Sequence, residues 1–265
     1  MQVAPINDIF VHWREDGDPT GMPVLFANSL GTDLRLWDDV LPLLPVGYRY
    51  IRYDKRGHGL TTATPAPYGM TGLVSDAASL LDHLGVKKTV IIGLSIGGMI
   101  AQGLAATRPD LVSALVLSNT AARMGTPQMW QERIDNITTH GIDACADDIM
   151  ARWFAPAFGQ SVAANPWRHM LTRTPVEGYL GCCHAIAQTD FTQSTAHLNL
   201  KLLAISGAQD GACPPESVAA TAGLVPNSRA IEMPDVGHLP CVEAPEAYSA
   251  ILTPFLKEVK NAVEI

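Results

Sequence analysis

One short segment constrains the fold of this chain more than any other. The apolar run Thr89–Ile92 leads into Gly93-Leu94-Ser95-Ile96-Gly97-Gly98, and an alanine-rich stretch follows. A β-branched strand that runs through Gly-x-Ser-x-Gly into a helix is typical of a nucleophile elbow, a sharp turn that projects the serine hydroxyl out of the chain. Glycines two residues before and after the serine let the strand and the helix approach closely. The segment therefore predicts a serine hydrolase with Ser95 as its nucleophile.

Strand-like and helix-like segments alternate along most of the chain. One stretch, residues 71–84, carries apolar residues near the i, i+3, i+4 spacing of a buried helix face. Such alternation predicts an α/β fold, with a mostly parallel sheet wrapped by helices. The expected strands are Ile9–Arg14, Pro23–Asn28, Tyr48–Asp54, Thr89–Leu94, Ala114–Ser118, Leu202–Ser206 and Arg229–Met233, followed by a last helix that begins near Pro245 and ends near Lys260.

The alternation stops in the middle of the chain. Residues 121–198 are helical and irregular in pattern and contain Trp130, Trp153 and Trp167. A helical insertion between two sheet strands is expected above the carboxyl edge of the sheet, where it covers the site. We therefore expect residues 1–120 and 199–265 to form the core and residues 121–198 to form a helical lid.

Composition and charge narrow the function. Of 265 residues, 47% are hydrophobic and 17% are charged, which suits a compact enzyme rather than a disordered or fibrous chain. The net charge of −8 argues against nucleic acid or an anionic membrane as a partner, because no cluster of lysine and arginine offers them a basic surface. The first residues lack a basic region followed by an apolar core, so no signal peptide is expected.

Cysteine usage argues for a reduced protein without a metal. The five cysteines form no Cys-x-x-Cys pair, so we expect free thiols and a cytoplasmic location. The run Cys182-Cys183-His184 does not match the spacing of zinc ligands. A phosphate-binding loop is also not expected, because the segment Gly93–Gly98 lacks the Gly-Lys-Ser/Thr ending of such loops. No metal or other cofactor is expected.

A serine nucleophile needs a base, and the base needs an orienting acid, because a serine hydroxyl is a weak nucleophile at neutral pH. After an elbow of this kind, the acid precedes the histidine along the chain. Of the eight histidines, His238 lies after the last strand and before the final helix, where a loop side chain can reach the serine, whereas His58 lies ahead of the nucleophile. We predict that His238 is the base.

The acid should follow one of the strands after the elbow. Asp210 follows the first strand after the lid, and we predict that it is the acid. Asn119 follows the strand before the lid, but an amide cannot orient an imidazole as a carboxylate does. Asp235 is the competing acid, although its place three residues before His238 suits a role in shaping the loop. Asp54 is expected to be a buried carboxylate in a structural turn.

A serine hydrolase also needs two N–H groups that point at the developing negative charge. The first is expected from Ile96, which directly follows the nucleophile. The second is expected from the loop after strand Pro23–Asn28, where we predict the Leu30 N–H, with Ser29 as the alternative donor.

With these residues in place, the chain resembles the α/β-hydrolase superfamily over its whole length and, more narrowly, the 3-oxoadipate enol-lactonases (β-ketoadipate enol-lactone hydrolases). The narrower resemblance rests on Asn28–Trp37, Arg52–Gly59, the lid opening Ser118–Pro127, Arg152-Trp153-Phe154 and Glu177-Gly178-Tyr179. It implies an α/β-hydrolase fold whose helical lid follows the sixth strand. It also implies a small lactone substrate with an acetate arm, formed during the breakdown of aromatic compounds and opened without a cofactor.

The resemblance implies a cation or strong donor for the carboxylate of that substrate. The candidates are the lid arginines Arg123, Arg133, Arg152, Arg168 and Arg173. Trp130 and Arg133, one helical turn apart, can place an aromatic wall and a cation on one face. We therefore predict Trp130, Arg133 and Trp153 as substrate-binding residues.

Other functions are compatible with the same residues. A carboxylesterase, a signal lactonase or a perhydrolase would use the same triad. A ligand receptor built on a hydrolase fold belongs to a different class, but the intact Ser95, Asp210 and His238 and the lack of an exposed apolar stretch favour an enzyme. Cofactor-free oxygenation has no dedicated sign in the sequence. The choice between a monomer and a homo-oligomer stays open.

Overall fold

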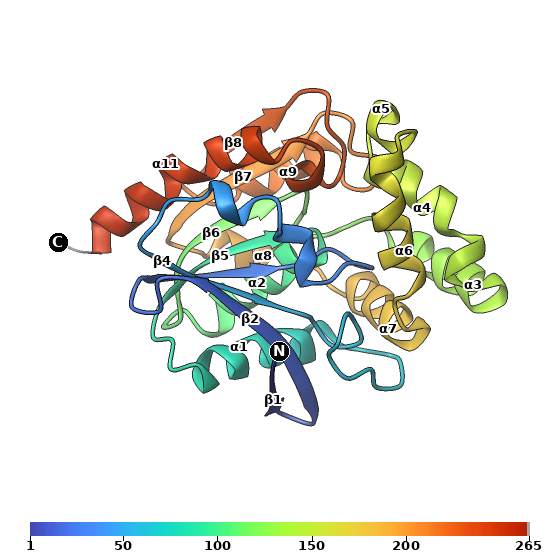
Figure 1. Ribbon diagram of the computed structural model, residues 1–265, viewed down its shortest axis with the longest axis horizontal. Coiled ribbons are helices and arrows are strands. Elements are labelled where there is room, and N and C mark those ends of the chain that lie inside the picture. Colours follow the sequence, from blue (N-terminus) through green and yellow to red (C-terminus); the bar gives the residue numbers. More distant parts are fainter. Residues whose placement is uncertain (264–265) are drawn as a thin grey trace.

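The computed structural model describes residues 1–263, which form an eight-stranded sheet with helices on both faces (Figure 1). The strand order is β1-β2-β4-β3-β5-β6-β7-β8. Strands β3 to β8 run parallel to one another, and β2 runs antiparallel to both of its neighbours. The strands are β1 (Gln2–Ile6), β2 (Ile9–Gly17), β3 (Met22–Ala27), β4 (Tyr48–Tyr53), β5 (Thr89–Leu94), β6 (Val112–Ser118), β7 (Lys201–Gly207) and β8 (Arg229–Met233).

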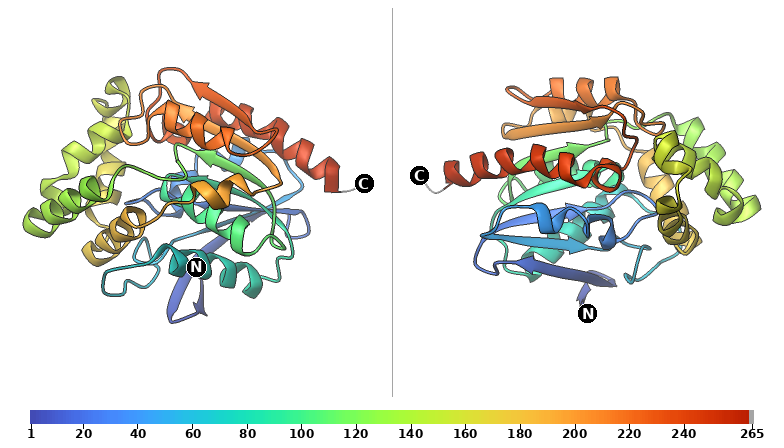
Figure 2. Two further views of the ribbon diagram at one scale, coloured as in Figure 1. Left: turned by 180° about the vertical axis from the view of Figure 1, so that it is seen from behind. Right: turned by 45° about the horizontal axis from the view of Figure 1, so that its top comes forward.

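Helices cover the sheet on both faces. Helix α11 lies across one face, and α1 and α2 lie side by side on the other (Figures 1 and 2). The helices of the core are α1 (Met70–His83), α2 (Ile96–Thr107), α9 (Pro215–Gly223), α10 (Pro240–Glu243) and α11 (Pro245–Val263). Short 3-10 turns are present at Leu34–Trp37, Leu41–Leu43 and Val162–Ala164.

A helical insertion separates β6 from β7. Its helices are α3 (Pro127–Ala144), α4 (Ala146–Trp153), α5 (Pro156–Gly159), α6 (Asn165–Thr172), α7 (Val176–Ala187) and α8 (Thr192–Ala196). Helices α3 to α7 gather beyond one end of the sheet in all three views (Figures 1 and 2). The sequence-based expectation of an α/β sheet with helices inserted after the sixth strand is confirmed, and the domain limits at residues 121 and 198 stay a prediction.

Each strand expected from the sequence is present, and one further strand was not expected. The largest difference in bounds is at β2, which continues to Gly17 instead of ending at Arg14. The additional strand β1 has only Ala4 and Ile6 buried and contains Pro5. Its alternation is too short to give a clear signal, and it is held by antiparallel pairing with β2 at the edge of the sheet.

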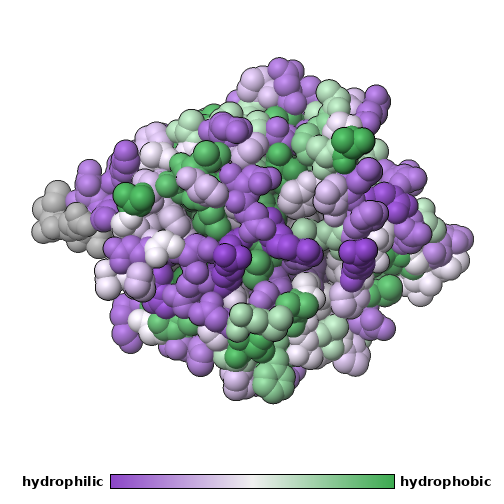
Figure 3. All heavy atoms as spheres, viewed as in Figure 1, coloured by the Kyte–Doolittle hydropathy of each residue, from purple (hydrophilic) through white to green (hydrophobic). Residues whose placement is uncertain are grey.

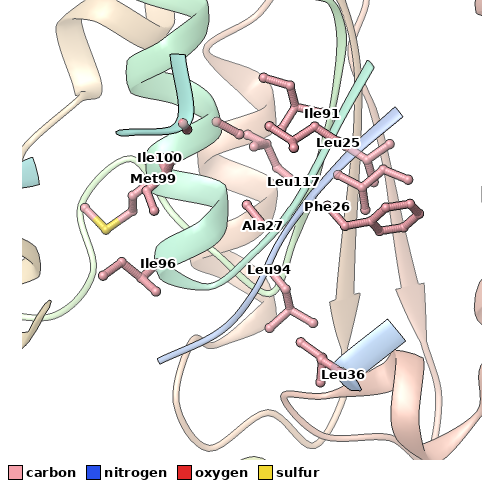
Figure 4. Packing of buried hydrophobic residues seen from close by; sticks show 14 of the residues in the cluster. Leu25, Phe26, Ala27, Leu36, Ile91, Leu94, Ile96, Met99, Ile100 and Leu117 are labelled. Carbon is pink, nitrogen blue, oxygen red and sulfur yellow. The ribbon is translucent and has the colours of Figure 1, made fainter. Parts of the chain in front are cut away.

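The core is built around β5 and α2. Every residue of β5 is buried, as expected for a central parallel strand with helices on both faces. Figure 4 shows side chains of the central strands, such as Ile91 and Leu117, beside Met99 and Ile100 of α2. Ser95 joins these two elements, so it stands at the middle of the carboxyl edge of the sheet.

The elbow depends on backbone contacts that leave no room for a side chain. A Cβ atom at Gly97 would lie 2.1 Å from the carbonyl oxygen of Ala27, and one at Gly93 would lie 2.4 Å from the carbonyl oxygen of Gly97. The closeness of β3, β5 and α2 is what the glycines flanking Ser95 predict.

The molecular surface shows how the chain meets water. On the face drawn in Figure 3, hydrophobic residues lie in small groups among hydrophilic ones.

All five cysteines are free and buried, which agrees with the thiol state expected from their spacing. The helices formed by residues 1–263 include none with the length and apolarity needed to cross a membrane.

The close approach at the elbow yields a stability prediction. Gly97→Ala should lower the free energy of unfolding by about 1–3 kcal/mol, because the added methyl group collides with the rigid backbone of Ala27. Gly72→Ala is the matched control: its Cβ meets nothing within 4 Å in helix α1, so it should stabilise the chain by about 0.5–1 kcal/mol. Urea unfolding measures both, and equal effects would contradict this account of the elbow.

Candidate active site

Ser95 occupies a strained position that its neighbours hold in place. Its φ of 58° and ψ of −122° lie outside the conformations that a serine ordinarily adopts. Its N–H donates to the Ser118 carbonyl at 3.0 Å, and its own carbonyl accepts the Thr120 hydroxyl at 2.7 Å. The loop after β6 therefore fixes the turn, and the Ser95 side chain faces a cavity at the end of the sheet.

His238 and Asp210 form a buried pair at the same edge. His238 Nδ1 donates to Asp210 Oδ2 at 2.8 Å, and the second carboxylate oxygen, Oδ1, accepts the N–H groups of Ala212 and Cys213 at 2.7 and 2.9 Å. Burial alone would raise the pKa of Asp210, but the facing His238 and these hydrogen bonds lower it overall. The carboxylate is therefore ionised at neutral pH and able to orient the imidazole.

Asp235, the competing acid, has no hydrogen bond to His238 within residues 1–263. Asp235 is exposed and adopts a φ of 60°, a left-handed conformation that suits a residue shaping the loop before His238. Ser95 and His238 line the same cavity, although no hydrogen bond joins them within residues 1–263. Such bonds often tighten only in the substrate complex.

The cavity beside Ser95 is small, about 50 Å³. Its lining includes the three residues predicted to bind substrate, Trp130, Arg133 and Trp153, together with Leu30, Ser29, Ser95, Met124, Gly125, Met129, Arg152, Tyr179, Ala212 and His238. Trp130 is fixed by its indole N–H, which donates to the Met124 carbonyl at 2.7 Å. The Arg133 guanidinium lies 5.5 Å from the centre of the Trp130 ring, so the aromatic wall and the cation share one face as the spacing predicts.

Two backbone N–H groups close to Ser95 along the chain or around its cavity are the predicted oxyanion donors. Ile96 is the first residue of α2, where an N–H has no partner inside the helix. Leu30 follows β3 and lines the cavity, and its N–H has no hydrogen-bond acceptor among residues 1–263. Ser29, the alternative donor, also lines the cavity. Ser95, His238 and Leu30 therefore share one cavity, Asp210 is hydrogen-bonded to His238, and Ile96 directly follows Ser95.

Comparison with known proteins agrees with this geometry. The sequence profile of the alpha/beta hydrolase fold matches residues 22–245. This chain belongs to the α/β-hydrolase fold family. A 3-oxoadipate enol-lactonase of Acinetobacter baylyi is 31% identical to it over 95% of this chain and 94% of the relative.

Solved structures of this family superpose closely on the hydrolase. The enol-lactonase from Burkholderia xenovorans has a TM-score of 0.93 and 32% identity, covering 97% of this chain and all of its own. A thermophilic esterase from Thermogutta terrifontis has a TM-score of 0.91 and 28% identity, covering 98% of this chain and 99% of its own. The hydrolase is thus similar over nearly its full length both to an enol-lactonase and to an esterase.

Asn119 is a site residue whose role the sequence did not predict. It follows β6 and donates its amide Nδ2 to Asp210 Oδ2 at 2.9 Å and to the Gly237 carbonyl at 3.2 Å. From the sequence, Asn119 was considered as the acid of the triad and rejected. In the structure its amide instead donates a hydrogen bond to the predicted acid, Asp210. The available signal was its place at the end of the strand next to β7, which positions it beside Asp210.

The structure also separates the five lid arginines. Arg133 and Arg152 line the cavity beside Ser95, and neither forms an ion pair within residues 1–263. The other three lie away from it: Arg123 faces Asp190 at 3.9 Å, Arg168 pairs with Asp143 and Asp147, each at 3.0 Å, and Arg173 lines a separate cleft of about 760 Å³ that holds neither Ser95 nor His238.

Glu243 ties the lid to the histidine loop. Its carboxylate accepts the N–H of Gly237 at 2.7 Å and the N–H of Ala155 at 2.9 Å. The His238 N–H donates to the carbonyl of Trp153 at 2.7 Å in the same region. Burial raises the pKa of Glu243, and the two N–H groups oppose that rise. The segment that ends α4 is therefore part of the support for His238.

The role of Asn119 can be tested by removing its amide without straining the chain. Asn119 has a φ of 49°, which glycine adopts freely, so Asn119→Gly should fold normally. Loss of a hydrogen bond to a charged carboxylate should lower kcat for p-nitrophenyl acetate by about tenfold. The control Asn227→Gly changes an exposed asparagine with a φ of 61° and should leave kcat unchanged. Wild-type kcat in folded Asn119→Gly would refute the supporting role.

Proposed function

We propose that this hydrolase opens the ring of 3-oxoadipate enol-lactone to give 3-oxoadipate, a step in the breakdown of aromatic compounds. The observation that carries the proposal is the pair Arg133 and Arg152, which line the cavity of Ser95 and have no carboxylate partner within residues 1–263. Two unpaired guanidinium groups beside a small cavity favour a compact substrate that bears a carboxylate. The similarity to enol-lactonases supports the same choice.

The first half of the reaction forms an acyl-enzyme. Ser95 Oγ attacks the lactone carbonyl carbon while its proton passes to His238, and Asp210 stabilises the imidazolium. The carbonyl oxygen becomes an oxyanion that accepts the N–H groups of Leu30 and Ile96. The ring C–O bond then breaks, and the leaving oxygen takes the proton from His238. The resulting enol tautomerises to a ketone, which makes ring opening effectively irreversible.

The second half of the reaction releases the product. A water molecule gives a proton to His238 and adds to the acyl carbon, which again places a negative charge on the oxygen in the oxyanion hole. The bond to Ser95 Oγ breaks, and the proton returns from His238 to the serine. The new carboxyl group loses its remaining proton to water, and 3-oxoadipate leaves with two carboxylates. The lid, which supplies Trp130, Arg133 and Trp153, sets the choice of substrate.

The proposal is tested by comparing lactone and ester turnover. In the wild type, the ultraviolet absorbance of the enol-lactone should be lost rapidly, and turnover of p-nitrophenyl acetate should be weak. Ser95→Ala and His238→Ala should each lower both activities by about 10³-fold or more. Ester turnover without lactone turnover would retain the triad and reject the substrate. Activity retained in Ser95→Ala would reject the triad.

The arginine pair makes a separate prediction about the substrate carboxylate. Arg133→Met and Arg152→Met should each lower kcat/KM for the enol-lactone by about 10- to 100-fold, because a charge-assisted contact is lost. Turnover of p-nitrophenyl acetate, which has no carboxylate, should change by less than about threefold. Arg168→Met is the control, because that side chain pairs with surface carboxylates. Equal losses for ester and lactone would contradict a role in carboxylate binding.

A further inference from the structure

Lys55 is a buried cation that the triad does not use. Lys55 lies in the turn after β4 and is only 2% exposed. Among residues 1–263, no carboxylate oxygen lies within 4.0 Å of its ammonium. Its ammonium instead donates to two backbone carbonyls, Ser29 O at 2.6 Å and Thr32 O at 3.2 Å. An ammonium buried without a carboxylate is costly to the fold, so a purely structural role would be served better by an apolar side chain.

The Ser29 carbonyl belongs to the same peptide unit as the Leu30 N–H. That peptide bond is trans, and in a trans peptide the C=O and N–H bonds point in opposite directions. When Lys55 holds the carbonyl from behind the loop, the Leu30 N–H is directed away from Lys55. Leu30 lines the cavity with Ser95 and His238. The Ser29 carbonyl also accepts the Thr32 N–H at 3.3 Å and the Thr32 hydroxyl at 2.9 Å. Lys55 therefore shares with Thr32 the orientation of one expected oxyanion donor, and it is the charged group of the two.

The next peptide is held from behind as well. The Gly31 N–H donates to His58 Nε2 at 2.9 Å, and His58 Nδ1 donates to the Arg56 carbonyl at 3.2 Å. Burial and the nearby Lys55 lower the pKa of His58 well below its usual value, so the imidazole is neutral and Nε2 can accept. The turn after β4 thus orients two consecutive peptides of the loop.

We propose that Lys55 is a positioning residue of the oxyanion hole, whose buried ammonium orients the Ser29–Leu30 peptide and adds positive potential behind the Leu30 N–H. The proposal rests on the serine acyl-transfer reaction proposed above but not on the identity of the acyl substrate. A fixed donor backed by a positive charge stabilises the oxyanion more in the transition state than in the ground state, so its effect belongs in kcat.

The groups around the ammonium determine when it is charged. Burial lowers the pKa of Lys55 to about 8, against the opposing effects of Cys182, Asp54 and Asp33. Cys182 comes from lid helix α7, and burial raises the pKa of its thiol to about 12, so it is neutral at lower pH. His58, the remaining group at the loop, is neutral near pH 7. The charge behind the Leu30 N–H should therefore be lost as the pH rises through about 8.

Activity and stability should respond to this titration in opposite directions. The pKa of Lys55 is lower in the folded chain than the ordinary 10.5, so the unfolded chain binds more protons between about pH 8 and 10.5. Lys55 therefore makes the folded state more stable as the pH rises through that range. A fall in kcat over the same range cannot be attributed to unfolding caused by this group.

The test compares Lys55→Met with Lys260→Met, using p-nitrophenyl acetate at pH 7. Lys260 also donates to a backbone carbonyl, that of Gly47 at 3.2 Å, and serves as the control for a lysine outside the site. Folded Lys55→Met should lose about 10- to 100-fold in kcat with KM changed by less than about threefold, and its affinity for phenylboronic acid, which forms a tetrahedral adduct on serine, should fall by a similar factor. Lys260→Met should match the wild type.

Each outcome of the test decides the proposal. Wild-type kcat in folded Lys55→Met, or a lower kcat with unchanged boronic acid affinity, overturns it. If Lys55→Met does not fold, the wild-type pH profile decides: a fall in kcat between pH 7 and 9.5 supports the proposal and a flat profile overturns it. Labelling of Ser95 by a fluorophosphonate checks the nucleophile independently, and loss of lactone turnover alone would reject the proposed substrate without affecting this test.

Discussion

The turn between β5 and α2 sets the position of every other part of the site. In the sheet, β5 lies between β3 and β6, so the loops that leave the carboxyl ends of those strands flank Ser95 on either side. The loop after β3 brings Leu30, the loop after β6 brings Asn119, and β7, the next strand, brings Asp210. Because parallel strands end at a common edge, the strand order alone assembles residues that are far apart in the sequence.

The lid helps to build this edge and does more than cover it. The carbonyl of Trp153, at the end of α4, accepts the His238 N–H. The Glu243 carboxylate accepts the N–H groups of Ala155 in the lid and Gly237 in the histidine loop, and so links the two. On the other side, α7 packs so closely on the turn after β4 that a Cβ at Gly178 would lie 2.0 Å from the Gly57 carbonyl oxygen. A change in the lid is therefore transmitted both to the base and to the turn that supports the oxyanion loop.

The sequence was enough to propose the parts of the candidate site that depend on regular structure. Ser95, Asp210 and His238 each follow a strand or precede a helix with a clear local pattern, and a parallel sheet brings such positions together. Among the lid arginines the spacing from Trp130 singled out Arg133 but not Arg152, because the direction of Arg152 depends on how α3, α4 and α7 pack, for which the chain carries no local signal. The supporting role of Asn119 was missed for a different reason: Asn119 was weighed only as a partner of the histidine, whereas its contact is with the acid.

Several features that are unfavourable to folding lie at this edge. Ser95 and Asn119 have positive φ angles, and Lys55 is a buried cation without a carboxylate partner within residues 1–263. The strained backbone of Ser95 costs about 1–3 kcal/mol, and burial of the Lys55 ammonium is unfavourable as well. The elements beneath them, β5 and α2, are among the most buried of the chain. These residues therefore cannot relax without opening the centre of the sheet, and that resistance is what a preorganised oxyanion site requires.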